Sequence, residues 1–299
     1  MNLVDRQVLP SELENVVMPA NEKSVELHAG VTLRYAEHGK SSGVPLLLLP
    51  GLGDSWRSFE PVLDSLPDSI RAIALTLRGH GDSTRPATGY GFDDFATDVE
   101  AFMNATGMKS AVLVGHSASG FFVQRLAIDH PERALALVFI ATPVTLRNHQ
   151  GLHEAWNSVI SKLSDPVDPE FVRDMQAGTL AKPVSEDFFE TLVAEAMKVP
   201  ARVWKQAFQH LLEQDLSDEI SNIQARTLIV WGDQDQVVSR SDQDALAAAI
   251  RGSSLLIYEG AGHSPHWEDP SRFASDLAAF VETLGPEDAT PVEARHNST

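Results

Sequence analysis

Val112-Leu113-Val114-Gly115-His116-Ser117-Ala118-Ser119-Gly120 is the stretch that decides the fold, because an apolar run passes directly into a helical pattern through small residues. A strand that enters a helix through so tight a turn holds its central residue in a strained backbone conformation, and only small neighbours fit. The turn lifts the Ser117 hydroxyl above the sheet beside the N-terminus of the helix, which favours developing negative charge. Ser117 is therefore a candidate nucleophile; the alternative is a turn that merely joins a strand to a helix.

Apolar runs and helical patterns alternate on both sides of this turn. Runs that are apolar throughout and bounded by turn residues indicate strands buried on both faces of a parallel sheet. Helical spacing of apolar residues predicts helices over 93–106, 121–129 and 242–250. The alternation predicts a parallel sheet with helices on both faces, preceded by a hairpin around Ala29-Gly30. The predicted strands span residues 24–27, 31–35, 45–49, 72–77, 110–114, 136–140, 227–230 and 254–258.

The alternation breaks over residues 145–222, where no strand-like run occurs and prolines separate four helix-length segments. We interpret this part as a helical cap inserted after the sixth strand. The core then comprises residues 24–144 and 223–285. Residues 1–23 form an N-terminal extension, either a surface helix or an arm for a partner, and the polar tail 286–299 is expected to be disordered.

Two further loops follow apolar runs and carry the residue types of acid–base catalysis. The loop after 227–230 holds Asp233 and Asp235, and the Gly-rich loop after 254–258 holds His263 and His266. Together with the Ser117 turn, each stands at the carboxyl end of a predicted strand, where open α/β sheets gather functional groups. A loop Asp often caps its own backbone, and a lone His is more often structural, so the residues alone leave both pairs open.

These motifs resemble those of the α/β-hydrolase family, and their chain order, Ser before Asp before His, is the family's order. The resemblance implies the α/β-hydrolase fold, a mostly parallel eight-stranded sheet with helices on both faces and an inserted helical cap. It also implies a catalytic triad in which Ser117 is the nucleophile, Asp235 the acid and His263 the base. Asp233 would then cap its own backbone, and His266 would line the entrance or pack locally.

The stretch Leu49-Pro50-Gly51-Leu52-Gly53-Asp54-Ser55-Trp56 resembles the family loop that supplies half of the oxyanion hole. By this resemblance the backbone N–H groups of Leu52 and Ala118 are the two donors. Pro50 stands where the family usually has His, a departure that bears on how the loop is supported. In the nucleophile turn, Ser119 stands at the last position of G-x-S-x-G, a mild departure because serine is small enough to fit. Arg78-Gly79-His80-Gly81-Asp82-Ser83 resembles a family turn that shapes the fold, so His80 is expected to be structural.

A serine nucleophile argues against the dehalogenases and epoxide hydrolases of this fold, which use Asp. It leaves hydrolysis of esters, lactones, thioesters or amides, carbon–carbon bond hydrolysis of vinylogous diketones, and perhydrolysis. Esters and lactones are the commonest of these substrates, so we expect an ester or a lactone. A ligand receptor on a hydrolase scaffold and a non-catalytic interaction protein are the alternatives from other classes.

The cap is expected to control substrate choice and to contribute little to the chemical step. Trp204 and Phe208 lie one helical turn apart and share a face. Such a roof suits an apolar ester or lactone better than a charged substrate. The predicted substrate-binding residues are Gly51, His116, Phe188, Trp204 and Phe208.

The net charge and the absence of cysteine exclude several classes of partner and site. The 299 residues carry a net charge of −19, from 23 basic and 42 acidic residues, which disfavours nucleic acid and anionic membrane surfaces. The absence of cysteine excludes disulfides, thiolate metal sites and a cysteine nucleophile. We expect no metal or cofactor, no signal peptide, no membrane span and a cytoplasmic location, and we leave a homodimer open.

Overall fold

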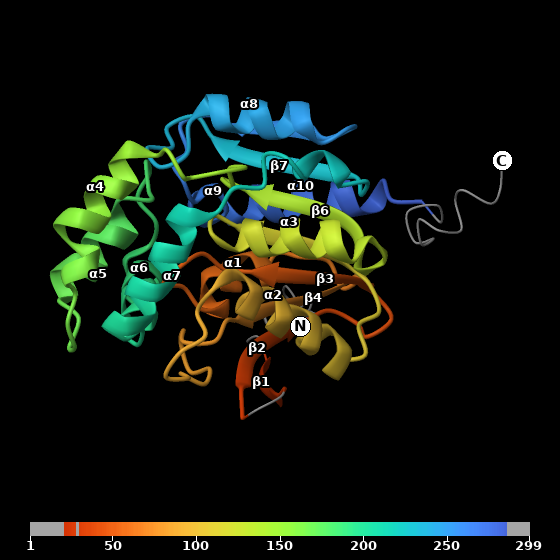
Figure 1. The fold of residues 1–299 in the computed structure, drawn as a ribbon. Coiled ribbons are helices and arrows are strands. Elements are labelled where there is room, and N and C mark those ends of the chain that lie inside the picture. Colours follow the sequence, from red (N-terminus) through yellow and green to blue (C-terminus); the bar gives the residue numbers. More distant parts are fainter. Residues whose placement is uncertain (1–20, 28–29, 286–299) are drawn as a thin grey trace, which may run out of the picture.

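The predicted strands form a single sheet in the order β1-β2-β4-β3-β5-β6-β7-β8, which confirms the mostly parallel eight-stranded architecture. The structure is a computed structural model that describes residues 21–27 and 30–285 (Figure 1). Within these residues β2 pairs antiparallel with both β1 and β4, and the later neighbours pair parallel. The strands are β1 Asn21–Glu26, β2 Thr32–His38, β3 Val44–Leu49, β4 Ile70–Thr76, β5 Ala111–His116, β6 Ala134–Ile140, β7 Thr227–Gly232 and β8 Ser254–Tyr258.

The first strand begins earlier than predicted. Residues 21–23, assigned to the N-terminal extension, belong to β1, where Lys23 stands opposite Tyr35 of β2. Residues 1–20 of that extension, the predicted tail 286–299 and the turn residue Ala29 lie outside the described residues.

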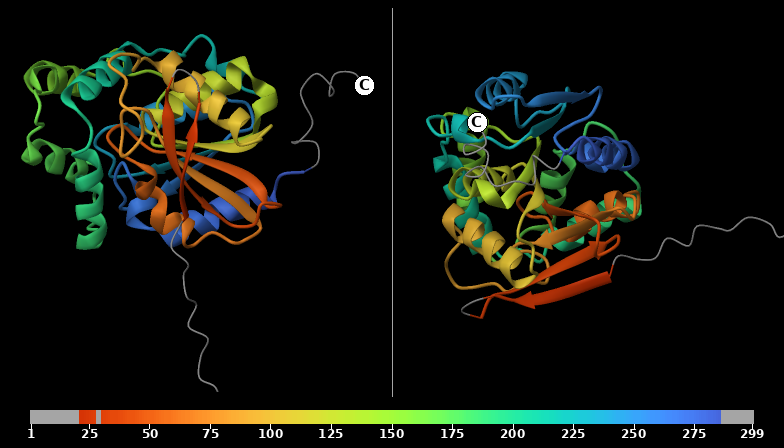
Figure 2. Two further views of the ribbon diagram at one scale, coloured as in Figure 1. Left: turned by 90° about the horizontal axis from the view of Figure 1, so that it is seen from below. Right: turned by 90° about the vertical axis from the view of Figure 1, so that its right-hand side faces the viewer.

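Helices cover both faces of the sheet, as Figure 2 shows in two further views. Alternate side chains of β3 enter two separate cores: Leu47 and Leu49 enter one, Leu46 and Leu48 the other. A strand buried on both faces reads as a continuous apolar run, which explains why these strands were visible in the sequence. The first core contains residues of α2 Phe92–Ala105, α3 Ser119–Asp129 and α8 Arg240–Ala249, and the second contains residues of α1 Glu60–Leu63 and α10 Pro270–Glu282.

The segment 145–222, which we call the α4–α7 segment, holds four α-helices and no named strand among these described residues. It leaves and rejoins the core at neighbouring points, because Thr145 forms a β-bridge with Asp215 and Leu216 N–H donates to Val144 O (3.2 Å). In Figure 1 its green and teal helices lie at the end of the molecule toward which β3, β6 and β7 point. The helices are α4 Gln150–Ser158, α5 Pro169–Ala177, α6 Glu186–Ala196 and α7 Ala201–Glu213.

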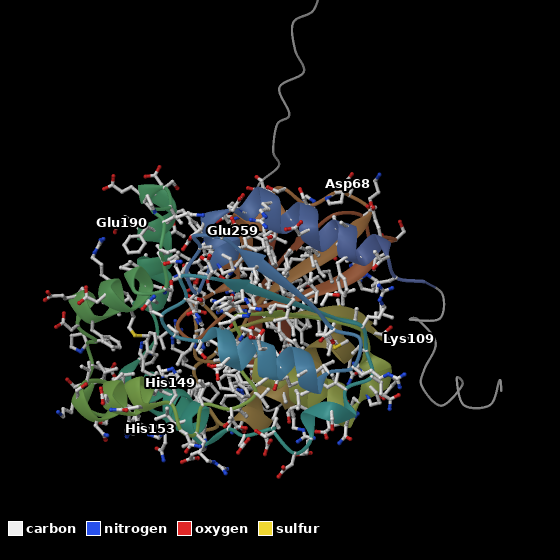
Figure 3. All side chains as sticks on the ribbon, turned by 90° about the horizontal axis from the view of Figure 1, so that it is seen from above. Asp68, Lys109, His149, His153, Glu190 and Glu259 are labelled. Atoms are coloured by element: carbon white, nitrogen blue, oxygen red, sulfur yellow. The ribbon has the colours of Figure 1, made fainter. Side chains whose placement is uncertain are left out.

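The α4–α7 segment lies at one end of the molecule, and strands β4 and β5 begin at the other end. Figure 3 shows His149, His153 and Glu190 at the end of the α4–α7 segment, and Asp68 and Lys109, which precede β4 and β5, at the opposite end. Among the described residues no helix is long and apolar enough to cross a bilayer. The remaining helices are α9 Pro265–Glu268 and the 3-10 helices η1 Trp56–Phe59, η2 Pro131–Arg133, η3 Ile160–Lys162 and η4 Ile220–Asn222.

Candidate active site

Ser117 stands in the turn between β5 and α3 with a backbone φ of +53°, a left-handed conformation that is strained for any residue but glycine. Its N–H donates to Ile140 O of β6 (2.8 Å), which holds the turn against the sheet. A side chain at Gly115 would lie 2.7 Å from the Gly120 backbone, and one at Gly120 would collide with Thr142. The tight packing therefore requires glycine at 115 and 120, whereas position 119 carries a fully buried serine.

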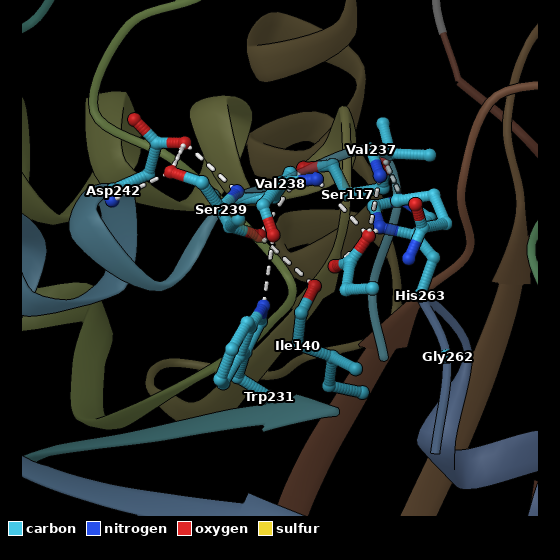
Figure 4. A network of polar contacts seen from close by, with 12 residues as sticks. Ser117, Ile140, Trp231, Val237, Val238, Ser239, Asp242, Gly262 and His263 are labelled. Carbon is cyan, nitrogen blue, oxygen red and sulfur yellow. Dashed lines mark hydrogen bonds and ion pairs between the residues drawn. The ribbon is translucent and has the colours of Figure 1, made fainter. Parts of the chain in front are cut away.

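Ser117, His263 and Asp235 come together at the carboxyl ends of β5, β8 and β7. Figure 4 shows Ser117 and His263 side by side. His263 Nε2 lies 2.9 Å from Ser117 Oγ, and His263 Nδ1 lies 2.9 Å from Asp235 Oδ2. A carboxylate only accepts, so the imidazole donates from Nδ1 and can accept the serine proton at Nε2. The arrangement can generate a nucleophilic alkoxide at Ser117 as its proton passes to the imidazole.

Backbone donors hold the Asp235 carboxylate in place. Its Oδ1 accepts from the N–H groups of Val237 (2.7 Å) and Val238 (3.0 Å), which Figure 4 includes, and its side chain is fully buried. The carbonyl of Val238 in turn accepts from Trp231 Nε1 (2.9 Å). The loop after β7 is thereby fixed with one carboxylate oxygen free to meet His263.

Asp233 and His266, the competing candidates, do not reach this centre. Asp233 is exposed, and its Oδ1 accepts from Gly260 N–H (2.6 Å). It thus joins the loops after β7 and β8, which corrects the prediction that it caps its own backbone. His266 is fully buried, with its ring 4.9 Å from that of Phe59 and 4.5 Å from that of His116, so it packs locally. Burial holds its pKa well below the usual value, so the ring is neutral.

The two predicted oxyanion donors have the hydrogen-bonding freedom that the role needs. Within the described residues, the backbone N–H groups of Leu52 and Ala118 donate to no protein acceptor. The loop that carries Leu52 is held by Ser119, whose Oγ donates to Pro50 O. The two departures from the family pattern, Pro50 and Ser119, therefore contact each other.

A cavity of about 220 Å³ lies over Ser117 and His263, with walls from the core loops and from α4, α5 and α7. The predicted substrate-binding residues Gly51, His116, Trp204 and Phe208 line it. Phe188 of α6 is not among the lining residues and is a correction to the prediction. Its half-buried ring packs edge-on against Trp267, at 6.3 Å between ring centroids, so it supports the wall from behind.

Two polar residues of the cavity wall, Asp54 and Gln176, were not predicted from the sequence. Asp54 is buried in the loop after β3, and its Oδ1 accepts from Gln176 Nε2 of α5 (3.0 Å). Burial raises the pKa of Asp54 to about 7, against the smaller opposing effects of Gln176 and His263. Asp54 stood inside the quoted loop motif, but no local pattern points to Gln176, which lies 122 residues away.

The Arg78 turn is structural, as expected. The Arg78 guanidinium forms a buried ion pair with Asp98 of α2 (2.5 Å), which ties the turn to that helix. His80 is buried, its Nδ1 donates to Arg78 O (2.9 Å), and burial lowers its pKa to about 4. Among the described residues no group of three or more acidic or histidine side chains is placed to hold a metal ion.

Comparison with known proteins adds independent evidence. The family described as alpha/beta hydrolase fold matches residues 44–270. The non-heme chloroperoxidase of Streptomyces lividans is 28% identical over 271 residues, which cover 85% of this chain and 97% of that protein. The 2-hydroxymuconate semialdehyde hydrolase of Pseudomonas sp. strain CF600 is 27% identical over 261 residues, covering 83% and 90%. A further curated relative is longer, and this chain spans 65% of its length.

Solved structures agree with this fold. The crystal structure of the esterase RhEst1 from Rhodococcus sp. ECU1013 superposes with a TM-score of 0.77 at 28% identity, and the match covers 90% of this chain and all of the esterase (100%).

Proposed function

Because the chain belongs to the alpha/beta hydrolase fold family, we propose that it is a serine hydrolase that cleaves a carboxylic ester or lactone of an apolar small molecule through an acyl-enzyme on Ser117. One observation carries the proposal. His263 bridges Ser117 Oγ and Asp235 Oδ2 with 2.9 Å on each side, at the floor of a cavity. The similarity to an esterase of 28% identity supports it.

Acylation begins when the Ser117 oxygen attacks the substrate carbonyl and its proton passes to His263 Nε2. Asp235 keeps Nδ1 protonated and stabilises the imidazolium. The N–H groups of Leu52 and Ala118 bind the oxyanion, each worth about 3 kcal/mol in the transition state. Collapse of the tetrahedral intermediate breaks the bond to the leaving oxygen, which takes the proton from Nε2.

Deacylation repeats these steps with water. His263 accepts a proton from the water as its oxygen attacks the acyl carbon, and the second intermediate expels Ser117, which recovers the proton. In a lactone the leaving alcohol and the acid stay on one molecule, so hydrolysis opens the ring.

The cavity wall indicates an apolar substrate. Its lining includes aromatic and aliphatic side chains of the α4–α7 segment, which exclude water around the scissile bond. We propose that this segment is a cap that selects substrates by shape, because the residues proposed for the chemistry all lie outside it. The lining side chains of this kind are Leu146, Leu152, Ile160, Trp204, Phe208 and Leu211.

The test combines labelling with a substrate panel. A fluorophosphonate should label the wild type at Ser117 and leave Ser117→Ala unlabelled. Esters and lactones of graded acyl size should show multiple turnovers that Ser117→Ala abolishes. Labelling without multiple turnovers would favour a ligand receptor on a hydrolase scaffold, and absence of labelling would overturn the proposed nucleophile.

A carbon–carbon bond hydrolase is the second candidate, because a 2-hydroxymuconate semialdehyde hydrolase is 27% identical over most of the chain. In that reaction the same residues would act on a vinylogous diketone, with a carbon leaving group protonated in place of an alcohol. A higher kcat/KM for a vinylogous diketone than for every ester in the panel would establish this alternative.

A further inference from the structure

The proton positions on His116 follow from its contacts. His116 is the last residue of β5, is fully buried, and places its Nε2 3.2 Å from His263 O. A carbonyl only accepts, so Nε2 carries the proton. Burial, together with the neighbouring His266 and His263 rings, holds the pKa of His116 well below its usual value. The ring is therefore neutral and presents a lone pair at Nδ1.

This lone pair has no partner of its own. His116 Nδ1 is buried without a hydrogen bond among the described residues, and Asp54 Oδ2 lies 4.0 Å from it. That separation is too long for a direct hydrogen bond. The separation matches a single ligand group whose heavy atom lies about 2.8 Å from both His116 Nδ1 and Asp54 Oδ2. Asp54 Oδ1 accepts from Gln176 Nε2, and Oδ2 is the carboxylate oxygen that lies 4.0 Å from His116 Nδ1.

Gly51 keeps the two acceptors clear. A side chain at Gly51 would place its Cβ 2.9 Å from His116 Nδ1 and 3.1 Å from Asp54 Oδ2. Gly51, Asp54 and His116 line the same cavity as Ser117 and His263. The cavity thus contains, beside the proposed nucleophile, a buried pair of acceptor atoms, one of them an imidazole nitrogen without a hydrogen bond among the described residues.

We propose that Asp54 Oδ2 and His116 Nδ1 form a subsite for a hydroxyl group of the substrate, so that the preferred substrate is a hydroxylated apolar ester or lactone. This inference rests on the proposed hydrolase function and deepens it by naming a substituent. An unpaired buried acceptor is costly, so a substrate hydroxyl that donates to one of these two acceptors is selected over an analogue that lacks the hydroxyl.

The chemistry of the pair favours a neutral hydroxyl over a charged group. A substrate carboxylate would be repelled by the Asp54 carboxylate and would find no donor at His116 Nδ1. An ammonium group would leave water for an apolar cavity. A hydroxyl can donate to Oδ2 when Asp54 is ionised. When Asp54 is protonated, the hydroxyl can accept from it and donate to His116. The groups that face Asp54 are the Gly51 N–H from its own loop, Gln176 from α5, His116 from the end of β5 and His263 from the loop after β8.

The experiment compares ester pairs that differ only by one hydroxyl, placed in turn on successive carbons of the acyl chain and of the alcohol. For one position, wild type should prefer the hydroxylated ester in kcat/KM by about tenfold to a hundredfold, the size expected for a hydrogen bond to a buried charged group. Asp54→Leu should reduce that ratio to near one. The charge-matched control Asp174→Asn, an exposed residue at the same cavity, should keep it.

A second variant separates subsite chemistry from folding. Asp54→Asn keeps the shape and an acceptor oxygen, so it should retain a preference for the hydroxylated ester. In wild type the preference should change between pH 6 and 8 as Asp54 titrates, and in Asp54→Asn it should be independent of pH. Equal losses for both members of every pair in Asp54→Leu and Asp54→Asn would assign Asp54 a structural role and overturn the subsite.

Binding to Ser117→Ala separates this inference from the proposed function. Calorimetry with the uncleaved ester pairs should show the same preference in Kd without turnover. If the preference appears in binding while wild type cleaves no ester, the subsite stands and the ester hydrolase proposal fails. If wild type cleaves both members of every pair equally and they bind equally, the subsite fails and the hydrolase stands. Absence of both turnover and binding overturns both.

Discussion

Ser117 combines two demands in one residue: it carries the proposed nucleophile, and it occupies a backbone conformation with φ +53° that suits glycine. Ser117→Ala and Ser117→Gly both remove the hydroxyl, so each should lower kcat about a millionfold. Only the glycine variant relieves the strain. It should be more stable than the alanine variant by about 1 kcal/mol in denaturant unfolding.

Retention of a tenth of the activity in either variant would remove Ser117 from its assigned role. Equal stability of the two variants would show that the turn carries no backbone strain.

The two aspartates after β7 have different partners and so predict different losses. Asp235 contacts His263, whereas Asp233 contacts Gly260 N–H. Asp235→Asn presents an amide to Nδ1, which favours the wrong imidazole tautomer and should lower kcat about ten-thousandfold. Asp233→Asn keeps an acceptor oxygen and should change kcat little. Steady-state kinetics of the two variants decide the assignment, and a larger loss at Asp233 would reverse it.

At the scale of elements, the loop after β3 depends on α3. The Ser119 hydroxyl donates to Pro50 O, two residues before the proposed donor Leu52. Ser119→Ala should let this loop move and weaken oxyanion binding, which occurs only in the transition state. We expect kcat to fall about tenfold with KM nearly unchanged. An increase in KM at constant kcat would show that Ser119 supports substrate binding instead.

Helix α7 contacts the same loop. A side chain at Gly53 would collide with the Trp204 ring, so this ring packs directly on the loop that carries Leu52. Phe208, one turn further along, lines the cavity and stacks with Trp156. Trp204 therefore joins substrate selection to loop support, which qualifies the expectation that the cap contributes little to the chemical step.

The two aromatic residues make a matched pair for testing this. Trp204→Ala should lower kcat for both a short acetate ester and a bulky aromatic ester. It should also reduce the ratio of their kcat/KM values, by an amount that corresponds to a few kcal/mol at most. Phe208→Ala should change discrimination only. If Trp204→Ala and Phe208→Ala changed kcat and discrimination in the same way, the proposed support of the oxyanion loop by Trp204 would be wrong.

At the scale of the whole molecule, folding buries Asp54, and this burial outweighs its hydrogen bonds and raises its pKa from 3.8 to about 7. A raised acid pKa means that the neutral form is favoured in the fold, so its contribution is fully present below pH 4 and is lost as the pH rises through 7. Asp54→Asn removes this titration. The variant should gain stability over wild type by a few kcal/mol at pH 8 and by much less at pH 4, since each pKa unit corresponds to about 1.4 kcal/mol.

Thermal unfolding of both proteins across this range measures the difference. A gap independent of pH would show that Asp54 titrates normally in the folded protein.

The sequence by itself determined the sheet, the Ser117 turn and the loops that carry Asp235 and His263. These features depend on local rules: apolar runs for strands buried on both faces, helical spacing between them, and small residues at a tight turn. Helices α1, α9 and α10 were not predicted; α1 and α9 have only four residues each, too few to display helical spacing.

Only the tertiary structure decided which distant side chains meet. It showed that Asp235 contacts His263 while Asp233 contacts Gly260, that Phe188 stays outside the cavity, and that Ser119 holds Pro50. It also brought Gln176 to Asp54 across 122 residues of chain. The reason is physical: such contacts depend on how the α4–α7 segment packs on the loops at the strand ends, and no periodicity within either segment records that packing.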